Sequence, residues 1–383
     1  MLECVGLKDV SDVVAMMLPA TPSIASAPGK AIIFGEHAVV RGAPAVVAVI
    51  NRRTTVKCQP NDGPWLIDGH PFDPVVMPHL GSLFRRLCPQ WSPPLRLEID
   101  SEVPMSGGLG SSAALCVAAA AALRACLGRW RCGDEWGSGF STDADVFGLG
   151  PFDDPPLHAP DETWTLIQGS EAVVPDEVMR LAHVAEAEAQ RGRASPTDTS
   201  ASALGGLIVV NPPDVHELSH LTHRTLSVDG AIQNWDLHRL TWDGPPLSCW
   251  FVDTGPAPST SEMVELVNEC VSGHSEASAA MNRMSDLGAV GIQAFLEGDV
   301  TAIGQIMDDQ QDCLRTFGAS TDIIDRCLEN VRPFVRGGKL TGAGGGGYVI
   351  LVPEDENRLA EVLQNMNLPW FEASLGGEGL RVA

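Results

Sequence analysis

Apolar and polar positions alternate with turn signals in the first third of the chain. From Ile24 to Val56, the apolar runs AIIF and AVVAVI are separated by turn residues, which predicts strands joined by a structured turn. The alternation from Leu95 to Ile99 predicts another strand. A glycine loop follows and leads into residues 111–127, whose alanines and leucines favour a helix.

Both kinds of element continue along the chain. A predicted helix begins at Pro175 and carries apolar positions at helical spacing. The later predicted elements are a strand from Leu204 to Val210, a strand from Leu247 to Val252, helices within residues 261–297 and 300–317, a strand from Val349 to Val352, and a helix near residues 354–366. Strands and helices in both halves predict an α+β or α/β protein.

The length of 383 residues is enough for two domains of ordinary size. We place the first domain at residues 1–220 and the second at 221–383. Within the first, residues 128–168 are rich in Gly, Pro and Asp and hardly contain a basic residue. This stretch is predicted to be a long insertion or a mobile flap outside the core.

Charge excludes several kinds of partner. Asp and Glu number 49 against 25 Lys and Arg, which gives a formal net charge of -24. Nucleic acids and anionic membranes are repelled by such a surface, so neither is expected as a partner. The N-terminal stretch is too charged for a secretory signal, and the longest apolar run is shorter than the roughly 20 residues of a membrane span. We expect a cytoplasmic protein with reduced, structural cysteines.

The stretch PMSGGLGSSAA, from Pro104 to Ala114, is the most informative one for chemistry. Its glycines allow the backbone to approach an anion, and the free amides and dipole at the start of the predicted helix attract it. A triphosphate fits these features. The stretch lacks the Walker pattern GxxxxGK(S/T) and the full GxGxxG spacing of dinucleotide-binding loops. The alternative is a tight strand-to-helix connection whose glycines serve packing.

Lys30, Glu36 and His37 stand in an otherwise apolar strand-turn-strand region. Lys30 is one of only four lysines in the chain. A desolvated ammonium at this place would bind an anion or acidify a neighbouring hydroxyl. The alternatives are a strand-end lysine that reaches solvent and a histidine with a structural role.

The remaining candidate functional residues are three carboxylates and a second glycine run. Asp198 is expected in a polar turn, as a general base or metal ligand, and Glu186 or Glu188 is a candidate magnesium ligand on the preceding helix. The alternatives are an aspartate that caps the turn and a solvated helix face. The run KLTGAGGGGY, which starts at Lys339, holds four consecutive glycines at an entropic cost, so we expect it to approach a ligand or another loop.

Together these stretches resemble the motifs of the GHMP kinase superfamily. Three motifs occur in the family's order: APGKAIIFGEHAVV from Ala27, PMSGGLGSSAA from Pro104, and KLTGAGGGG from Lys339. The form GEHAVV is similar to that of mevalonate kinases, and SPTDTSASALGG, which starts at Ser195, resembles the archaeal ones.

The resemblance implies a two-domain α+β GHMP kinase fold. Its N-terminal domain would be like ribosomal protein S5, with a left-handed βαβ unit, and its C-terminal domain would be ferredoxin-like. It further implies a kinase that uses ATP and Mg²⁺ to phosphorylate the C5 hydroxyl of (R)-mevalonate in isoprenoid biosynthesis. The alternatives are another acceptor, such as phosphomevalonate or a sugar, and a non-catalytic ligand sensor. A homodimer is left open.

Motif matching also implies roles for single residues. Asp198 and Lys30 would be the catalytic pair. The phosphates of ATP would be bound by Pro104, Ser106, Gly107, Gly108, Leu109, Gly110, Ser111 and Ser112. Mevalonate would be contacted by Lys30, Glu36, His37, Asp198, Thr260, Gly344 and Gly345. Magnesium would be held by Ser112 and Glu186, with Glu188 in place of Glu186 if Arg191 is not an inserted residue.

Overall fold

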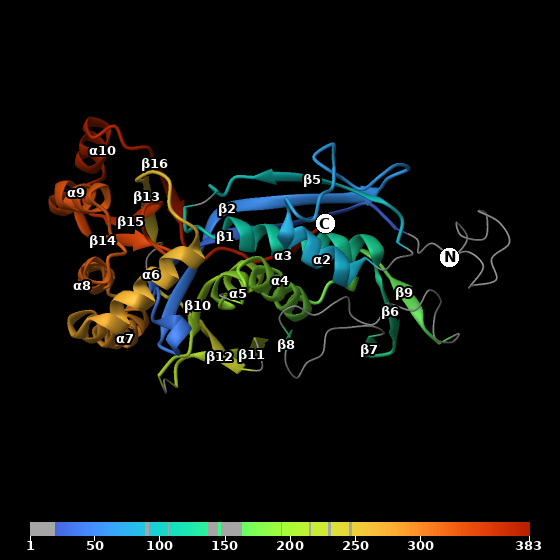
Figure 1. Cartoon of the computed structure of the whole chain (residues 1–383), viewed down its shortest axis with the longest axis horizontal. Helices are drawn as coiled ribbons and strands as arrows, with labels where there is room; N and C mark the ends of the chain where they lie inside the picture. Colours follow the sequence, from blue (N-terminus) through green and yellow to red (C-terminus); the bar gives the residue numbers. More distant parts are fainter. Residues whose placement is uncertain are drawn as a thin grey trace.

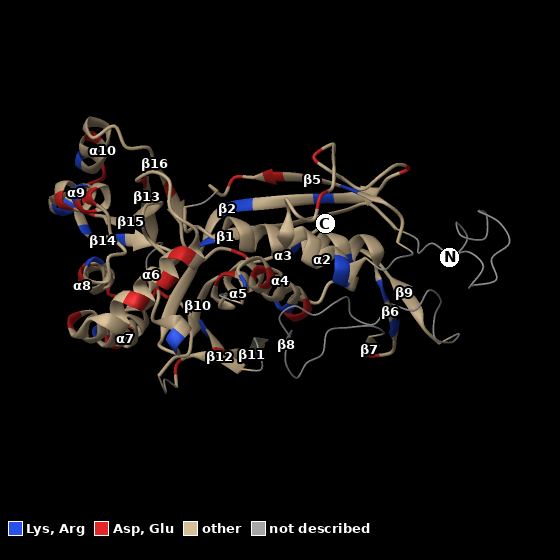
Figure 2. Ribbon diagram, viewed as in Figure 1, with Lys and Arg blue, Asp and Glu red and all other residues tan. Residues whose placement is uncertain are grey.

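The computed structural model describes residues 20–88, 92–105, 107–136, 145–146, 163–192, 194–213, 216–228, 231–244 and 247–383. The fold is α+β, and its elements form two groups along the long axis of the molecule (Figure 1). Among the described residues, no helix has the length and apolar character needed to cross a membrane. Lys and Arg are scattered among Asp and Glu over both groups (Figure 2).

The first group is built on a sheet of ten described strands. These are β1 (Ser23–Phe34), β2 (Ala45–Pro60), β3 (Leu66–Ile67), β4 (His70–Pro71), β5 (Leu95–Ser101), β8 (Asp145–Val146), β10 (Leu207–Val210), β11 (Ser219–Val228), β12 (Ala231–Leu240) and β17 (Arg381–Val382). Its helices are α2 (Pro78–Leu87), α3 (Ser111–Leu127), α4 (Pro175–Ala189) and α5 (Thr197–Leu204).

The long strand β2 organises this sheet. β1 pairs antiparallel with it from Ser23 to Phe34, so β5 and β10 share its other edge. Both are antiparallel to β2 and hence parallel to each other, and α3, α4 and α5 lie in the connection between them. This is the predicted βαβ arrangement, and its left hand stays a prediction because strand pairing does not define it.

Helix α3, which the alanine-rich pattern predicts as a helix, lies in the core of the first group. It contacts β1 and β2 on one side and α4 and α5 on the other (Figure 1). Nearly every residue from Ala113 to Leu127 is buried. Small alanine side chains let the helix pack against elements on several sides, and they leave its first turn close to β1.

The second group has a four-stranded antiparallel sheet in the order β14-β15-β13-β16. Its elements are β13 (Ser248–Asp253), α6 (Thr260–Gly273), α7 (Ser275–Leu296), α8 (Val300–Thr316), α9 (Asp322–Val331), β14 (Val335–Thr341), β15 (Tyr348–Pro353), α10 (Glu356–Asn365) and β16 (Trp370–Ser374). Counted from β13, the sheet order is 2-3-1-4, which is the predicted ferredoxin-like arrangement.

The first sheet continues past residue 220. β11 and β12 form a hairpin, and β12 pairs with β10 and buries Trp235 and Leu237. The change from one sheet to the other therefore falls between Leu240 and Ser248. The division into domains at 1–220 and 221–383 stays a proposal.

The predicted insertion, residues 128–168, is described in part. β6 (Arg129–Cys132), β7 (Glu135–Trp136) and β9 (Thr165–Ile167) form a small sheet beside α3, and β8 pairs with β11. Residues 137–144 and 147–162 lie outside the described residues. Whether the segment acts as a flap stays a prediction.

Candidate active site

A buried ammonium joins three elements of the first group. Lys30 lies on β1 and is 2% exposed. Its Nζ atom lies 2.9 Å from Oδ2 of Asp198 and donates a hydrogen bond to the carbonyl oxygen of Gly108 at 3.0 Å. The alternative of a strand-end lysine reaching solvent is therefore wrong.

Asp198 lies in the first turn of helix α5, and the prediction of a polar turn was wrong. Its side chain is 36% exposed and does not cap the helix. The carboxylate thus has one side against Lys30 and another open to a ligand. This is the geometry required of a group that accepts a proton from a bound substrate.

The first glycine loop lies directly on β1. The backbone N–H of Lys30 donates to Leu109 at 2.9 Å. Gly108 and Gly110 have φ of 82° and 71°, and a Cβ atom on Gly110 would lie 2.9 Å from Cγ of Lys30. The loop ends at the N-terminus of α3, whose first turn carries no acidic residue. Its free amides and helix dipole suit an anion next to Lys30.

The second glycine run packs against the first, which confirms the expectation that it approaches another loop. A Cβ atom on Gly108 would lie 2.4 Å from the carbonyl oxygen of Thr341, and one on Gly342 would lie 2.6 Å from Cα of Gly108. The N–H of Tyr348 donates to Gly107 at 3.3 Å. Only glycine permits this approach, so the phosphate loop candidate is supported from the second group.

Glu186 is the helix α4 carboxylate that faces the loop. It is 5% exposed, and its side chain is hydrogen-bonded to Ser112 and Gln190. Burial raises the pKa of Glu186 to about 7; the charge of Asp198 adds to the rise, while Ser112 and Lys30 oppose it. Ser112, Glu186, Asp198 and Lys30 therefore form one cluster.

Glu188 points elsewhere. Its carboxylate pairs with Arg86 at 2.7 Å and with Arg85 at 2.6 Å, both from α2. Neither glutamate belongs to a solvated helix face, since Glu188 is only 11% exposed and Glu186 less. Of the two candidate magnesium ligands, Glu186 is the one brought to Ser112.

Glu36 and His37 lie in the turn after β1. Glu36 is 1% exposed and forms an ion pair with Lys339 of β14. His37 has φ of 59°, and its Nε2–H donates to the carbonyl oxygen of Ala343 at 2.9 Å. Burial lowers the pKa of His37 to about 4, so the ring is neutral at pH 7. The contact with Ala343 is one that a structural histidine also makes.

The loop before Thr260 packs on the second glycine run. A Cβ atom on Gly345 would lie 2.8 Å from Cδ of Pro258, and the N–H of Gly347 donates to Gly255 at 2.8 Å. Gly344 approaches Ala319 instead. Thr260 itself is exposed at the start of α6, so its contact with a substrate stays a prediction.

The remaining loop residues are placed in part. Pro104 is half-buried, Leu109 is buried and Ser111 lies in the first turn of α3. Ser106 lies outside the described residues.

Sequence reasoning gave no role to Lys339. Its ammonium is fully buried against Glu36, 303 residues away in the chain. The scarcity of lysine was the available signal, since Lys30 and Lys339 are two of four.

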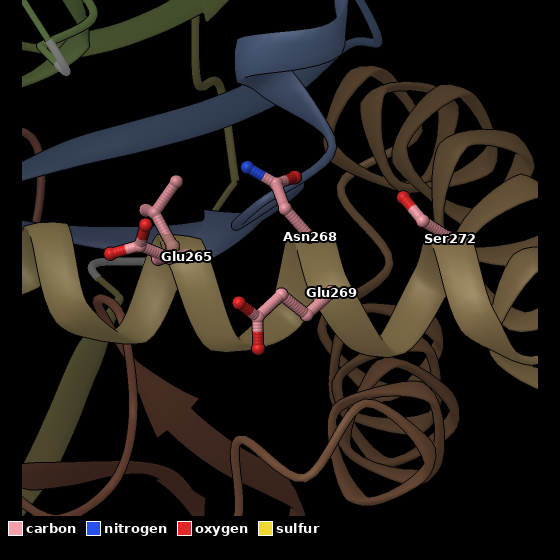
Figure 3. Close-up of a pocket in the computed structure, with 5 residues that line it drawn as sticks. Glu265, Asn268, Glu269 and Ser272 are labelled. Carbon is pink, nitrogen blue, oxygen red and sulfur yellow. The ribbon is translucent and has the colours of Figure 1, made fainter.

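A hollow of about 390 Å³ lies along α6, away from this cluster. Figure 3 shows Glu265, Asn268, Glu269 and Ser272 on its wall. Arg41 donates to Asn268 at 2.8 Å. None of the candidate site residues lines this hollow.

Two family models match the chain, one in each group of elements. The model described as GHMP kinases N terminal domain matches residues 79–134, which include the first glycine loop. The model described as GHMP kinases C terminal matches residues 292–370, which include the second. Both the N-terminal and the C-terminal GHMP kinase domain are therefore matched in this chain.

Relatives that resemble the chain over most of its length carry the name mevalonate kinase. The chain is 29% identical to the protein of Aeropyrum pernix over 94% of its own length and 97% of the relative's. It is 28% identical to that of Archaeoglobus fulgidus over 85% and 90%. The solved structure of L. major mevalonate kinase in complex with R-mevalonate has the same fold, with a TM-score of 0.63 at 19% identity, covering 94% of this chain and 98% of that one.

Proposed function

We propose that this protein is a GHMP kinase that transfers the γ-phosphoryl group of ATP to the C5 hydroxyl of (R)-mevalonate. The products are 5-phosphomevalonate and ADP, in the mevalonate pathway of isoprenoid biosynthesis. The observation that carries the proposal is the contact of buried Lys30 with both Asp198 and the glycine loop. The names of the archaeal relatives support the choice of mevalonate. A cytoplasmic location and a homodimer remain predictions.

Lys30 and the loop amides supply positive charge for phosphoryl transfer. The transition state spreads negative charge over the γ-phosphoryl oxygens, so catalysis depends on positioning and neutralisation. Lys30 is held by Asp198 and Gly108, which fixes its ammonium at the start of α3. A chain with a net charge of -24 needs this local arrangement to hold ATP at all.

Asp198 receives the proton of the acceptor hydroxyl. The oxygen of that hydroxyl forms a bond to the γ-phosphorus, the bond from phosphorus to the β,γ-bridging oxygen breaks, and ADP leaves. Lys30 favours the developing alkoxide by its charge. Because Asp198 is partly exposed beside a buried ammonium, it reaches a bound hydroxyl without losing its counter-ion.

Ser112 and Glu186 fit a magnesium ion. Both offer oxygen ligands, which Mg²⁺ prefers, and one or two carboxylates together with phosphates are its usual set in kinases. The buried Glu186 carboxylate, whose pKa is raised by burial, lies 3.7 Å from Nε2 of His79 and is influenced by the charge of Lys30. When bound, the ion would neutralise charge on the β- and γ-phosphate oxygens. No cluster of three or more His, Cys, Asp or Glu suited to a metal occurs in the described ranges.

The proposal is tested by offering the purified enzyme ATP and a panel of acceptors. The panel contains (R)-mevalonate, 5-phosphomevalonate, galactose and homoserine, and both ADP release and the phosphorylated product are measured. We expect kcat/KM for mevalonate to exceed that for every other acceptor by at least about a hundredfold, roughly 3 kcal/mol of discrimination. A preference for any other acceptor would overturn the choice of mevalonate.

A further inference from the structure

Lys339 is the second buried lysine among the residues that the structure describes. It lies on β14, and its side chain is 0% exposed. The ammonium pairs with Oε1 of Glu36 and donates to the carbonyl oxygen of Leu340 at 2.7 Å. Its two partners among the described residues, Glu36 and Leu340, lie outside the first glycine loop, so Lys339 acts on the site through Glu36.

The two carboxylate oxygens of Glu36 differ in their hydrogen bonding. Its Oε2 atom is buried and accepts no hydrogen bond from another residue among those described. A buried acceptor without a donor costs free energy, so its presence needs an explanation. A hydroxyl group of a bound acceptor would supply the missing donor.

The turn that carries Glu36 is held by the second group of elements. The N–H of Gly35 donates to Gln310 at 3.1 Å, and that of Ile32 donates to Thr341 at 3.0 Å. Together with the contact of Lys339, these bonds set the place of Glu36 from α8 and β14. The orientation of its free oxygen therefore depends on both groups.

The charges near Glu36 indicate how Lys339 affects its carboxylate. The charge of Lys30 acts on both Glu36 and Lys339, so Lys30, Asp198, Glu36 and Lys339 form two matched pairs near one another. Burial raises the pKa of Glu36, and Lys339 opposes the rise. Without Lys339, burial would favour the neutral carboxyl over the carboxylate that accepts hydrogen bonds with both oxygens.

We propose that Lys339 is a positioning residue of the acceptor site: its ammonium keeps Glu36 ionised and in one orientation, so that Oε2 accepts a hydrogen bond from an acceptor hydroxyl. The proposal rests on the proposed function in that the acceptor is a small hydroxylated molecule bound beside Glu36.

The test compares Lys339→Met, Glu36→Gln and the double variant with the wild type. Lys57→Met is the matched control, because Lys57 is an exposed lysine on β2. The KM for acceptor, the KM for ATP and kcat are measured with whichever acceptor the wild type phosphorylates best. The identity of that acceptor decides the proposed function, so the two proposals fail separately.

We expect Lys339→Met and Glu36→Gln each to raise the acceptor KM at least about tenfold, the value of one lost charge-assisted hydrogen bond. The KM for ATP should stay within about twofold of the wild-type value. The acceptor KM of the double variant should not exceed that of the poorer single variant, because the two residues act as a unit. If Lys339→Met fails to fold, the double variant should still fold, since no buried charge is left unpaired. Its acceptor KM should then equal that of Glu36→Gln.

The proposal is overturned if the acceptor KM of Lys339→Met stays within about twofold of the wild type. It is also overturned if acceptor and ATP KM values rise together, or if the losses multiply in the double variant, because both results indicate a general structural role.

Discussion

The chemistry of the site depends on where a few charged side chains are buried. Lys30, 2% exposed, contacts the partly exposed Asp198, and Glu186 lies in the same cluster. Two glutamates two residues apart on α4, Glu186 and Glu188, differ completely in their partners. The spacing of residues in a sequence does not show this difference, because it depends on which side of α4 meets α3 and which meets α2.

The two glutamates are predicted to respond differently to loss of charge. Glu186→Gln should raise the Mg²⁺ concentration for half-maximal rate at least about tenfold, because the cluster loses its metal-ligand candidate. Glu188→Gln should leave that concentration unchanged and lower the free energy of unfolding by about 2 kcal/mol, since Arg86 loses a charged partner. Magnesium titrations and urea unfolding measure the two effects. Equal magnesium dependence in both variants would contradict the assignment of Glu186.

At the scale of elements, two glycine loops from different sheets meet at the start of α3. Gly108 and Gly342 approach closely enough that neither tolerates a Cβ atom. The first turn of helix α3, which carries no acidic residue, lies at this meeting point. The proposed phosphate site is thus formed by contact between elements.

We predict that Gly108→Ala lowers kcat/KM for ATP at least about tenfold, because the new methyl group would lie 2.4 Å from Thr341 and separate the loops. Gly42→Ala is the matched control: Gly42 has φ of 85°, close to the 82° of Gly108, but a Cβ atom there meets nothing within 4 Å. The control should lose about 1 kcal/mol of stability and keep its activity. Equal activity losses in the two variants would mean that backbone strain, and not loop contact, is responsible.

The sequence predicts elements well where local preference and burial agree. Helix α3 begins and ends at Ser111 and Leu127 as predicted, since its alanines favour a helix in any context. Helix α5 was missed because TDTSASAL has weak helix propensity, and the burial of Thr197, Thr199 and Ser200 shows that packing stabilises it. The pair of Glu36 and Lys339 could not be predicted either, because it depends on the docking of two sheets.

At the scale of the whole molecule, the two groups are joined through the turn after β1. His37 donates to Ala343, Gly35 donates to Gln310 and Glu36 pairs with Lys339. Each of these contacts joins the turn after β1 to the second group of elements, while Oε2 of Glu36 accepts no hydrogen bond from another described residue. Glu36 and His37, the candidate acceptor contacts, are therefore held in place by the same contacts that join the two groups of elements.

This arrangement predicts a pH dependence of stability. Burial lowers the pKa of His37 from 6.5 to about 4. Between pH 6.5 and pH 4, His37 therefore carries a proton in the unfolded chain but not in the folded chain. Stability is therefore lost as the pH falls from 6.5 to 4, by up to about 3 kcal/mol from this group. His37→Asn, which tolerates the positive φ, should show a shallower loss of unfolding free energy in urea titrations across the window.

The exposed His70→Asn serves as the control for this titration and should follow the wild type. If His37→Asn loses stability with acid as steeply as the wild type does, the burial of a neutral His37 at the junction is not what limits acid stability.

The central claim is that Lys30 and Asp198 together transfer a phosphoryl group from ATP to the acceptor. The most direct measurement is single-turnover transfer of radiolabelled γ-phosphate from ATP to mevalonate by the wild type, Lys30→Met, Asp198→Asn and the control Lys57→Met. We predict that the first two variants fold and bind ATP but transfer the label at least about a thousandfold more slowly, while Lys57→Met transfers it at the wild-type rate. Transfer by Lys30→Met or Asp198→Asn within about tenfold of the wild-type rate would contradict the account.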